Sequence, residues 1–100
     1  MTEKLCPPIH PGEILMEDFI EGFDITQHKL AVSISVTPRR INEIVHGKRA
    51  ITADTALRLG RYFGVEPQFW LNWQSRYELE LAEDRVVEHV AAISPIQGAS

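Results

Sequence analysis

The residues best able to do chemistry in this sequence lie between positions 37 and 49, where guanidinium, amide, hydroxyl and ammonium groups are crowded together. Guanidinium and amide groups can make paired hydrogen bonds to base edges in the major groove of DNA, and lysine and arginine can neutralise phosphates. The pattern therefore predicts a surface that binds nucleic acid. The polar residues concerned are Thr37, Arg39, Arg40, Asn42, Glu43, His46, Lys48 and Arg49.

Two short helices joined by a tight turn, over about residues 26–47, would hold this surface outward. Thr26 and Thr37 are expected N-caps, because a threonine hydroxyl accepts hydrogen bonds from N–H groups that a helix start leaves unpaired. Pro38 suits the first position of the second helix, and Gly47 suits its left-handed end. Apolar residues at helical spacing would form the buried sides. They are Leu30, Ala31 and Ile34 in the first helix, and Ile41, Ile44 and Val45 in the second.

Residues 27–49 resemble the helix-turn-helix of the Cro and lambda-repressor-like family, also called XRE-type. The family pattern is Q-x-x-L-A-x-x-x-x-V-[TS]-x-x-x-I-x-x-[IL]-x-x-G-K-R. One position departs from the family, because Ser35 stands where glycine is usual in the turn. A serine with positive φ is uncommon and mildly strained, so either the turn differs locally or the strain is tolerated. The matching residues are Gln27, Leu30, Ala31, Val36, Thr37, Ile41, Ile44, Gly47, Lys48 and Arg49.

Two further stretches narrow the resemblance to the HigA antitoxin family, also called virulence-associated protein I. Residues 8–15 read PIHPGEIL, where the family has HPGEIL. Residues 51–74 resemble DTALRLA-x-x-F-x-x-x-P-x-F-W-L-N-L-Q, with Gly60 in place of the usual alanine and Trp73 in place of the usual leucine. The resemblance covers about residues 8–82 and rests on three motifs in order.

This resemblance implies an all-α, five-helix, lambda-repressor-like DNA-binding domain with a helix-turn-helix and an extended C-terminal helix. It also implies a homodimer that binds a palindromic operator in double-stranded DNA. Members of the family typically repress their own operon and neutralise a HigB-like, mRNA-cleaving toxin of the RelE-like fold. Two alternatives remain open, namely a stand-alone transcription factor and a toxin-binding module with little DNA binding.

Roles can be assigned to the polar residues of the helix-turn-helix. Arg39 is the first candidate for a bidentate contact with guanine, because the start of the second helix goes deepest into the groove. Glu43 could accept a hydrogen bond from cytosine or orient Arg39 through an i, i+4 ion pair. The resemblance places Gln27 at a position whose amide commonly contacts a phosphate. The predicted base-reading residues are Arg39, Arg40, Asn42 and Glu43, and the predicted phosphate-binding residues are Gln27, Thr37, Lys48 and Arg49, with Arg40 also able to reach a phosphate.

The charge distribution supports this assignment, although the net charge of −4 does not. Residues 1–25 carry one lysine and six acids, and residues 63–100 carry two arginines and six acids. Residues 26–62 carry seven Lys or Arg and only two acids. Because the local field governs attraction to phosphate, the central segment is expected to face DNA. The acidic ends favour contact with a basic partner, but solvated acidic faces are the commoner explanation.

One hundred residues are enough for one compact domain and too few for two. Residues 1–10 are expected to form an extended N-terminal arm, because Pro7 and Pro8 disfavour a helix. Residues 11–92 would form the single helix-turn-helix domain, and residues 93–100 a flexible tail. The single cysteine, Cys6, and the absence of a signal peptide or a membrane-length apolar run indicate a cytoplasmic protein without a membrane segment.

The fourth and fifth helices raise separate questions. Thr52 is expected to cap the fourth helix. Its buried side is expected to carry Ala56, Leu57 and Phe63. Its Arg58 and Arg61 either extend the phosphate-binding surface or are solvated or paired with acids. The fifth helix begins near Pro67 and carries a stripe at i, i+4, i+8 and i+12. That stripe is Phe69, Trp73, Tyr77 and Leu81, with Trp70 and Leu71 beside it.

The aromatic residues of the fifth helix predict a dimer contact. All of them could fill the core of one copy, but a small helical core cannot easily cover aromatics on two sides of one helix. Part of this surface is therefore expected to bury a second copy. The candidate dimer residues are Trp70, Trp73 and Tyr77.

Catalysis, metal binding and cofactor binding are not expected. The four histidines, His10, His28, His46 and His89, are widely spaced and have no nearby nucleophile or carboxylate in a catalytic arrangement. No C-x-x-C, H-E-x-x-H or glycine-rich phosphate loop is present. His46 lies near a helix end that favours a cation, so capping is at least as good an interpretation as contact with DNA.

Overall fold

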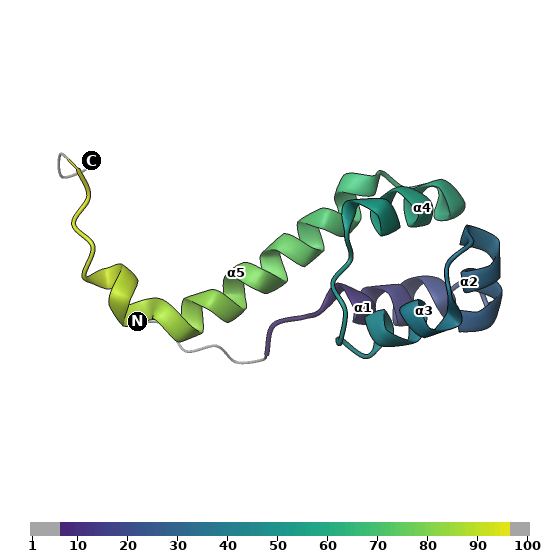
Figure 1. Ribbon diagram of the computed structural model, residues 1–100, viewed down its shortest axis with the longest axis horizontal. Helices are drawn as coiled ribbons and strands as arrows, with labels where there is room; N and C mark the ends of the chain where they lie inside the picture. Colours follow the sequence, from purple (N-terminus) through teal and green to yellow (C-terminus); the bar gives the residue numbers. More distant parts are fainter. Residues whose placement is uncertain (1–6, 97–100) are drawn as a thin grey trace.

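The computed structural model describes residues 7–96, and its regular elements are all helical (Figure 1). The predicted arm and tail lie partly outside this range, as does Cys6. Residues 7–10 precede the first helix without regular structure. The elements are α1 (Pro11–Ile14), which runs directly into the π-helical η1 (Leu15–Ile20), then α2 (Gln27–Ile34), α3 (Pro38–Val45), α4 (Ala53–Phe63) and α5 (Pro67–Ala91).

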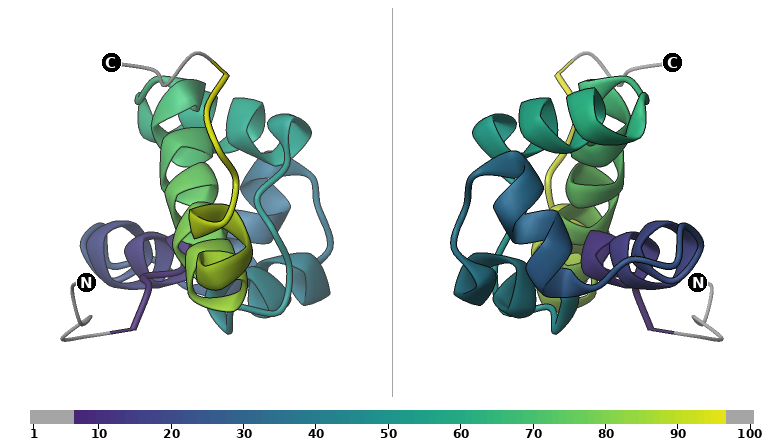
Figure 2. Two further views of the ribbon diagram at one scale, coloured as in Figure 1. Left: turned by 90° about the vertical axis from the view of Figure 1, so that its left-hand side faces the viewer. Right: turned by 90° about the vertical axis from the view of Figure 1, so that its right-hand side faces the viewer.

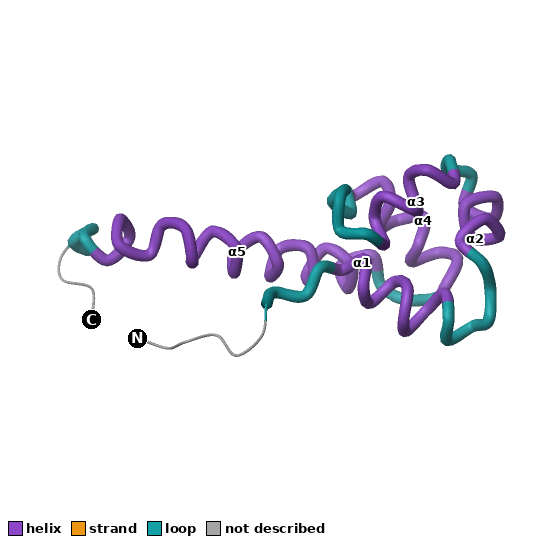
Figure 3. The backbone as a smooth tube through the Cα atoms, turned by 90° about the horizontal axis from the view of Figure 1, so that it is seen from below, coloured by secondary structure: helices purple, strands orange, loops and turns teal. Residues whose placement is uncertain are grey.

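The molecule has a compact end and a projecting helix. The segments α1, α2, α3 and α4 gather around the start of α5, and the rest of α5 extends away from them (Figures 1 and 3). Viewed along α5, α4 lies on the opposite side of the compact end from α1 and α3 (Figure 2). The extents of 52 × 26 × 20 Å reflect this projection. The predicted all-α fold with a helix-turn-helix and a long last helix is confirmed.

The helix starts follow from their capping residues. Thr26 Oγ1 accepts a hydrogen bond from Lys29 N at 3.0 Å, and Thr37 Oγ1 accepts one from Arg40 N at 3.1 Å. Both predicted caps are therefore confirmed. The sequence reasoning missed a further cap, because His10 Nδ1 accepts a hydrogen bond from Gly12 N at 2.8 Å at the start of α1.

A single apolar core joins all the helices of the compact end. Trp70 lies inside it, with ring centroids 4.8 Å from Phe19 and 5.0 Å from Phe69. Burying these side chains is the main stabilising contribution, because each removes a large apolar surface from water. The buried apolar residues of this core are Leu15, Ile20, Leu30, Ala31, Ile34, Ile41, Ile44, Ile51, Ala56, Leu59 and Trp70.

Two sequence predictions about burial are wrong. Trp70 is 0% exposed, so it has no surface to offer a second copy and is not a dimer-interface residue. Leu57 is 61% exposed, because the buried face of α4 runs through Ala56, Leu59 and Gly60 instead.

The structure gives a physical reason for Gly60, which stands where the family pattern has alanine. A Cβ there would lie 2.6 Å from the carbonyl oxygen of Val65, too close for an alanine without a shift of the chain.

The second half of α5 projects without cover from the compact end. Val86 has non-helical backbone angles (φ −121°, ψ 19°), which mark a kink. Apolar side chains remain exposed before, at and after this kink, at Leu79, Val86 and Val90, and at Ile93 just beyond the end of α5. They follow one another at spacings of seven, four and three residues. No helix among residues 7–96 is long and apolar enough to span a membrane.

Candidate nucleic-acid interface

The outer edge of α3 is fixed by two isoleucines behind it. Ile41 and Ile44 are completely buried, whereas the Arg39 side chain is 85% exposed. The start of α1 passes so close behind α3 that a Cβ at Gly12 would overlap the carbonyl oxygen of Ile44. The first residues of α3 are therefore presented to solvent from a tightly packed base.

Glu43 ties two arginines into one surface. Its two carboxylate oxygens accept hydrogen bonds from Arg39 Nε at 2.9 Å and from Arg49 Nε at 2.8 Å. The bonds to Arg49 and then to Arg39 hold the pKa of Glu43 below its usual value. Glu43 was expected either to accept a hydrogen bond from cytosine or to orient Arg39, and the structure contains the i, i+4 ion pair with Arg39. Each arginine donates to Glu43 from Nε. The edge of the guanidinium that carries Nη1 and Nη2 therefore does not face Glu43.

Arg40 lies in a different environment from Arg39, although the two are adjacent in the sequence. Its Nη1 donates to Asp54 Oδ2 at 3.2 Å and to Thr55 Oγ1 at 3.5 Å, both on α4. The same Asp54 oxygen accepts from Arg58 Nε at 3.1 Å. The bond from Arg58, then the one from Arg40, lowers the pKa of Asp54 from its usual value. The structure thus binds Arg40 to α4 rather than grouping it with Arg39.

Gln27 and Asn42 meet between the two helices of the motif. Asn42 Nδ2 donates to Gln27 Oε1 at 3.4 Å, and Gln27 Nε2 lies 3.7 Å from Met16 Sδ as a weak donor. Gln27 is the first residue of α2 and is half-buried, while Asn42 is exposed. The sequence did not predict this contact, because Gln27 and Asn42 lie fifteen residues apart and no periodic pattern links them.

The remaining predicted residues lie at the ends of α3. The hydroxyl of Thr37 is engaged in capping α3. Lys48 and Arg49 are exposed in the segment after the helix. His46 Nδ1 lies 2.8 Å from the carbonyl oxygen of Asn42, in the geometry expected of a residue at a helix end. This arrangement agrees with the capping interpretation of His46.

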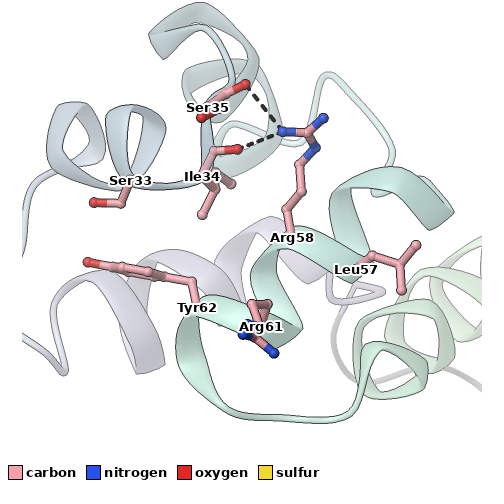
Figure 4. A pocket seen from close by; sticks show the side chains of 7 residues that line it. All are labelled: Ser33, Ile34, Ser35, Leu57, Arg58, Arg61 and Tyr62. Carbon is pink, nitrogen blue, oxygen red and sulfur yellow. Dashed lines mark hydrogen bonds between the residues drawn. The ribbon is translucent and has the colours of Figure 1, made fainter.

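Arg58 of α4 also contacts a distant part of the chain, which the sequence did not predict. Its Nη1 donates to the carbonyl oxygen of Ile34 at 2.7 Å and to that of Ser35 at 3.3 Å (Figure 4). It borders a surface hollow of about 370 Å³ between α2 and α4, which is also lined by Leu57 and Tyr62. Arg58 was expected either to extend the phosphate-binding surface or to be solvated or paired with acids. The structure shows it paired with Asp54 and bonded to backbone carbonyls of the turn after α2.

No group of three or more His, Cys, Asp or Glu side chains within residues 7–96 is placed to hold a metal ion. His10, the most buried histidine of this range, caps α1 through Nδ1. Burial lowers its pKa, against smaller opposing effects of Glu13 and the backbone of Arg49.

Comparison with known proteins gives consistent matches. The model of the Helix-turn-helix family matches residues 18–70. Virulence-associated protein I of Dichelobacter nodosus is 56% identical over 77 residues, which cover 77% of this chain and 71% of that protein. The structure is similar to that of the Pseudomonas aeruginosa antitoxin HigA with the higBA promoter (TM-score 0.84, 44% identity, 89% of this chain and 98% of that one).

A further solved structure, of an addiction module antidote protein of the HigA family from Coxiella burnetii, is similar over its whole length. Its TM-score is 0.85 at 38% identity, covering 91% of this chain and 100% of that one. The two structural matches cover about nine tenths of the chain and so extend well beyond the helix-turn-helix.

Proposed function

The chain belongs to the HigA antitoxin family of helix-turn-helix proteins, and from this membership we propose that it is a sequence-specific DNA-binding repressor that acts as an antitoxin. The observation that carries the proposal is the exposed edge of α3. There Arg39 projects from a helix backed by buried isoleucines and is held by Glu43. A guanidinium fixed by a carboxylate loses less freedom on binding a base, because its orientation is already restricted.

Within this proposal Arg39 reads a base and Glu43 orients it rather than reading one itself. Asn42 remains a base-reading candidate, since an exposed amide on the same helix can pair with adenine. Gln27, Thr37, Lys48 and Arg49 remain the phosphate candidates. Thr37 and Gln27 stand at helix starts, where backbone N–H groups and the helix dipole favour an anion. Arg40, bound to Asp54, is left as a weaker candidate.

A homodimer is part of the proposal, because a palindromic operator requires two copies of α3. The exposed apolar side chains of the second half of α5 support it, since an uncovered stripe on a projecting helix is unfavourable in water. Trp73 and Tyr77 keep part of their surface exposed and remain candidates. We propose that the contact lies chiefly further along α5, at Leu79, Val86 and Val90, and just beyond its end, at Ile93.

A toxin of the HigB type, with a RelE-like fold, is the proposed protein partner. Residues 7–25 carry five exposed acids and neither lysine nor arginine, so this part of the surface attracts a cationic protein. The alternatives are a regulator without a toxin and a toxin-binding module with little affinity for DNA. We propose that the protein acts in the cytoplasm, as expected of a repressor that binds DNA.

A gel-shift titration with the DNA upstream of the protein's own gene tests the proposal. We expect a discrete complex that survives a large excess of unrelated DNA and is lost when the palindrome is scrambled. Equal binding to native and scrambled DNA would contradict the repressor function. The toxin partner is tested separately, by co-purification with the protein encoded by a short basic reading frame beside the gene.

A further inference from the structure

The turn of the helix-turn-helix is stabilised by a residue from another helix. Ser35 has φ 62° and ψ 46°, the left-handed conformation that costs a serine more than a glycine. The backbone there follows the Schellman pattern, with Ser35 N donating to Val32 O at 3.2 Å and Val36 N donating to Ala31 O at 3.0 Å. These two bonds pair the carbonyls of Ala31 and Val32 only.

The carbonyls of Ile34 and Ser35, at the end of α2 and in the turn, accept hydrogen bonds from a guanidinium. Arg58 Nη1, from α4, donates to Ile34 O at 2.7 Å and to Ser35 O at 3.3 Å (Figure 4). The last carbonyls of a helix carry partial negative charge and lack partners within the helix, so a cation there is favourable. Arg58 therefore offsets part of the cost of the unusual conformation at Ser35.

The same guanidinium is connected to α3. Arg58 Nε donates to Asp54 Oδ2 at 3.1 Å, and that oxygen also accepts from Arg40 Nη1 at 3.2 Å. A continuous chain of hydrogen bonds thus runs from the end of α2 through two residues of α4 to Arg40 in the first turn of α3. This chain joins the two sides of the turn that sets the angle between α2 and α3.

We propose that Arg58 is a positioning residue for DNA recognition, which fixes the turn after α2 and, through Asp54, the first turn of α3. Its guanidinium supports the edge that carries Arg39 instead of binding a phosphate. The inference rests on the proposed DNA-binding function. It adds a residue to the recognition machinery that touches no base and lies outside the helix-turn-helix motif.

Arg58→Lys is the decisive variant, because lysine keeps the charge but has no forked donor that can reach the turn and Asp54 together. We expect binding to the native upstream DNA to weaken on the order of tenfold, as for loss of a hydrogen bond to a charged group. Binding to unrelated DNA should be unchanged. The matched control is Arg61→Lys, at the exposed arginine nearly one turn further along α4, which should bind both DNAs as the wild type does.

The salt dependence separates positioning from phosphate binding. A phosphate contact predicts that Arg58→Gln lowers the slope of log K against log salt concentration by about 0.9, and that Arg58→Lys binds like the wild type. The positioning role predicts an unchanged slope for Arg58→Gln and a lower ratio of specific to non-specific affinity for both variants. Asp54→Asn, which removes the carboxylate in the middle of this series of hydrogen bonds, should also lower the ratio of specific to non-specific affinity.

Glycine at the turn supplies a rescue. Adding Ser35→Gly to Arg58→Lys should restore part of the specific affinity, because glycine adopts the left-handed conformation without the steric cost. A role in stability alone would lower the melting temperature and leave the affinity ratio of the folded protein unchanged. The inference is overturned if Arg58→Lys, folded by circular dichroism, discriminates between the two DNAs as the wild type does. Failure of the wild type itself to discriminate would instead count against the proposed function.

Discussion

The edge of α3 and the second half of α5 are both exposed, yet they differ in how their side chains are satisfied. On α3, Arg39 has an ionic partner, and the face behind it is fully buried. On α5 beyond Leu79, apolar side chains such as Val90, which is 56% exposed, face water around a kink at Val86. One surface is ordered by contacts within a single chain, and the other lacks a cover for its apolar groups.

This difference indicates how the two surfaces would act. A preorganised polar edge can bind a charged ligand with little loss of conformational freedom. An apolar helix face gains free energy only when a second surface removes it from water. We therefore propose that the first surface recognises DNA and that the second forms the contact between copies.

The largest expected effect is on stability, at the base of α3. Ile44→Ala should lower the free energy of unfolding by about 2–5 kcal/mol, because it leaves a cavity in the core behind the recognition edge. Val90→Ala on the projecting helix should change it by less than about 0.5 kcal/mol in the monomer. Urea denaturation at low protein concentration measures both. An equal decrease in the free energy of unfolding for Ile44→Ala and Val90→Ala would contradict the proposed difference between α3 and the second half of α5.

The second prediction concerns association. Val90→Asp should weaken dimerisation by about 2 kcal/mol, because it would place a carboxylate in the apolar contact. Sedimentation equilibrium should show a shift to the mass of one chain, with the unfolding free energy of that chain nearly unchanged. His89→Asp, at the neighbouring exposed position, is the control for added charge. If Val90→Asp keeps the mass of the wild type, α5 is not the dimer contact proposed here.

A smaller effect is expected at the end of α3. Lys48→Ala should weaken binding to every DNA sequence by about 1 kcal/mol and lower the salt slope by about 0.9, as for one lost phosphate contact. Titrations at several salt concentrations measure the slope. A change in sequence preference without a change in slope would place Lys48 among the base-reading residues instead.

The smallest effect concerns the carboxylate of Glu43. Its pKa is below the usual 4.5 in the folded protein, so its ion pairs contribute stability at neutral pH, and this contribution is lost as the pH falls through the folded pKa. Arg49→Ala should raise this pKa towards 4.5, and by more than Arg39→Ala does, because Arg49 is the larger cause. Carboxyl NMR titration measures both variants. A midpoint that neither variant moves would show that the bridge is absent in solution.

Local signals in the sequence were enough to predict the helix-turn-helix and its two threonine caps, although they missed the His10 cap of α1. Thr26 and Thr37 are caps because a hydroxyl three residues before an N–H is a local arrangement. The i, i+4 pairing of Arg39 with Glu43 is also local and was anticipated. The all-α class and the helix-turn-helix follow from such signals together with the family resemblance.

What the sequence missed depends on contacts between distant segments. Arg58 meets the turn across more than twenty residues, and Asn42 meets Gln27 across fifteen. No periodicity encodes such pairs. Burial on α5 was misjudged for the same reason, since the aromatic residues at its start pack against Phe19 of η1, and only the three-dimensional fold shows that Trp70 points inward.

The most direct test of the account compares two arginines that differ chiefly in location. Arg39 pairs with Glu43 on α3, and Arg76 pairs with Glu80 on α5 at the same i, i+4 spacing. Each is changed to alanine, and the affinity for the native upstream DNA is measured by titration with variants that keep the wild-type mass in solution. We predict a loss of about 1–3 kcal/mol and a relaxed preference at one base of each half-site for Arg39→Ala alone. Unchanged binding of Arg39→Ala, or an equal loss in both variants, would contradict the assignment of DNA recognition to the edge of α3.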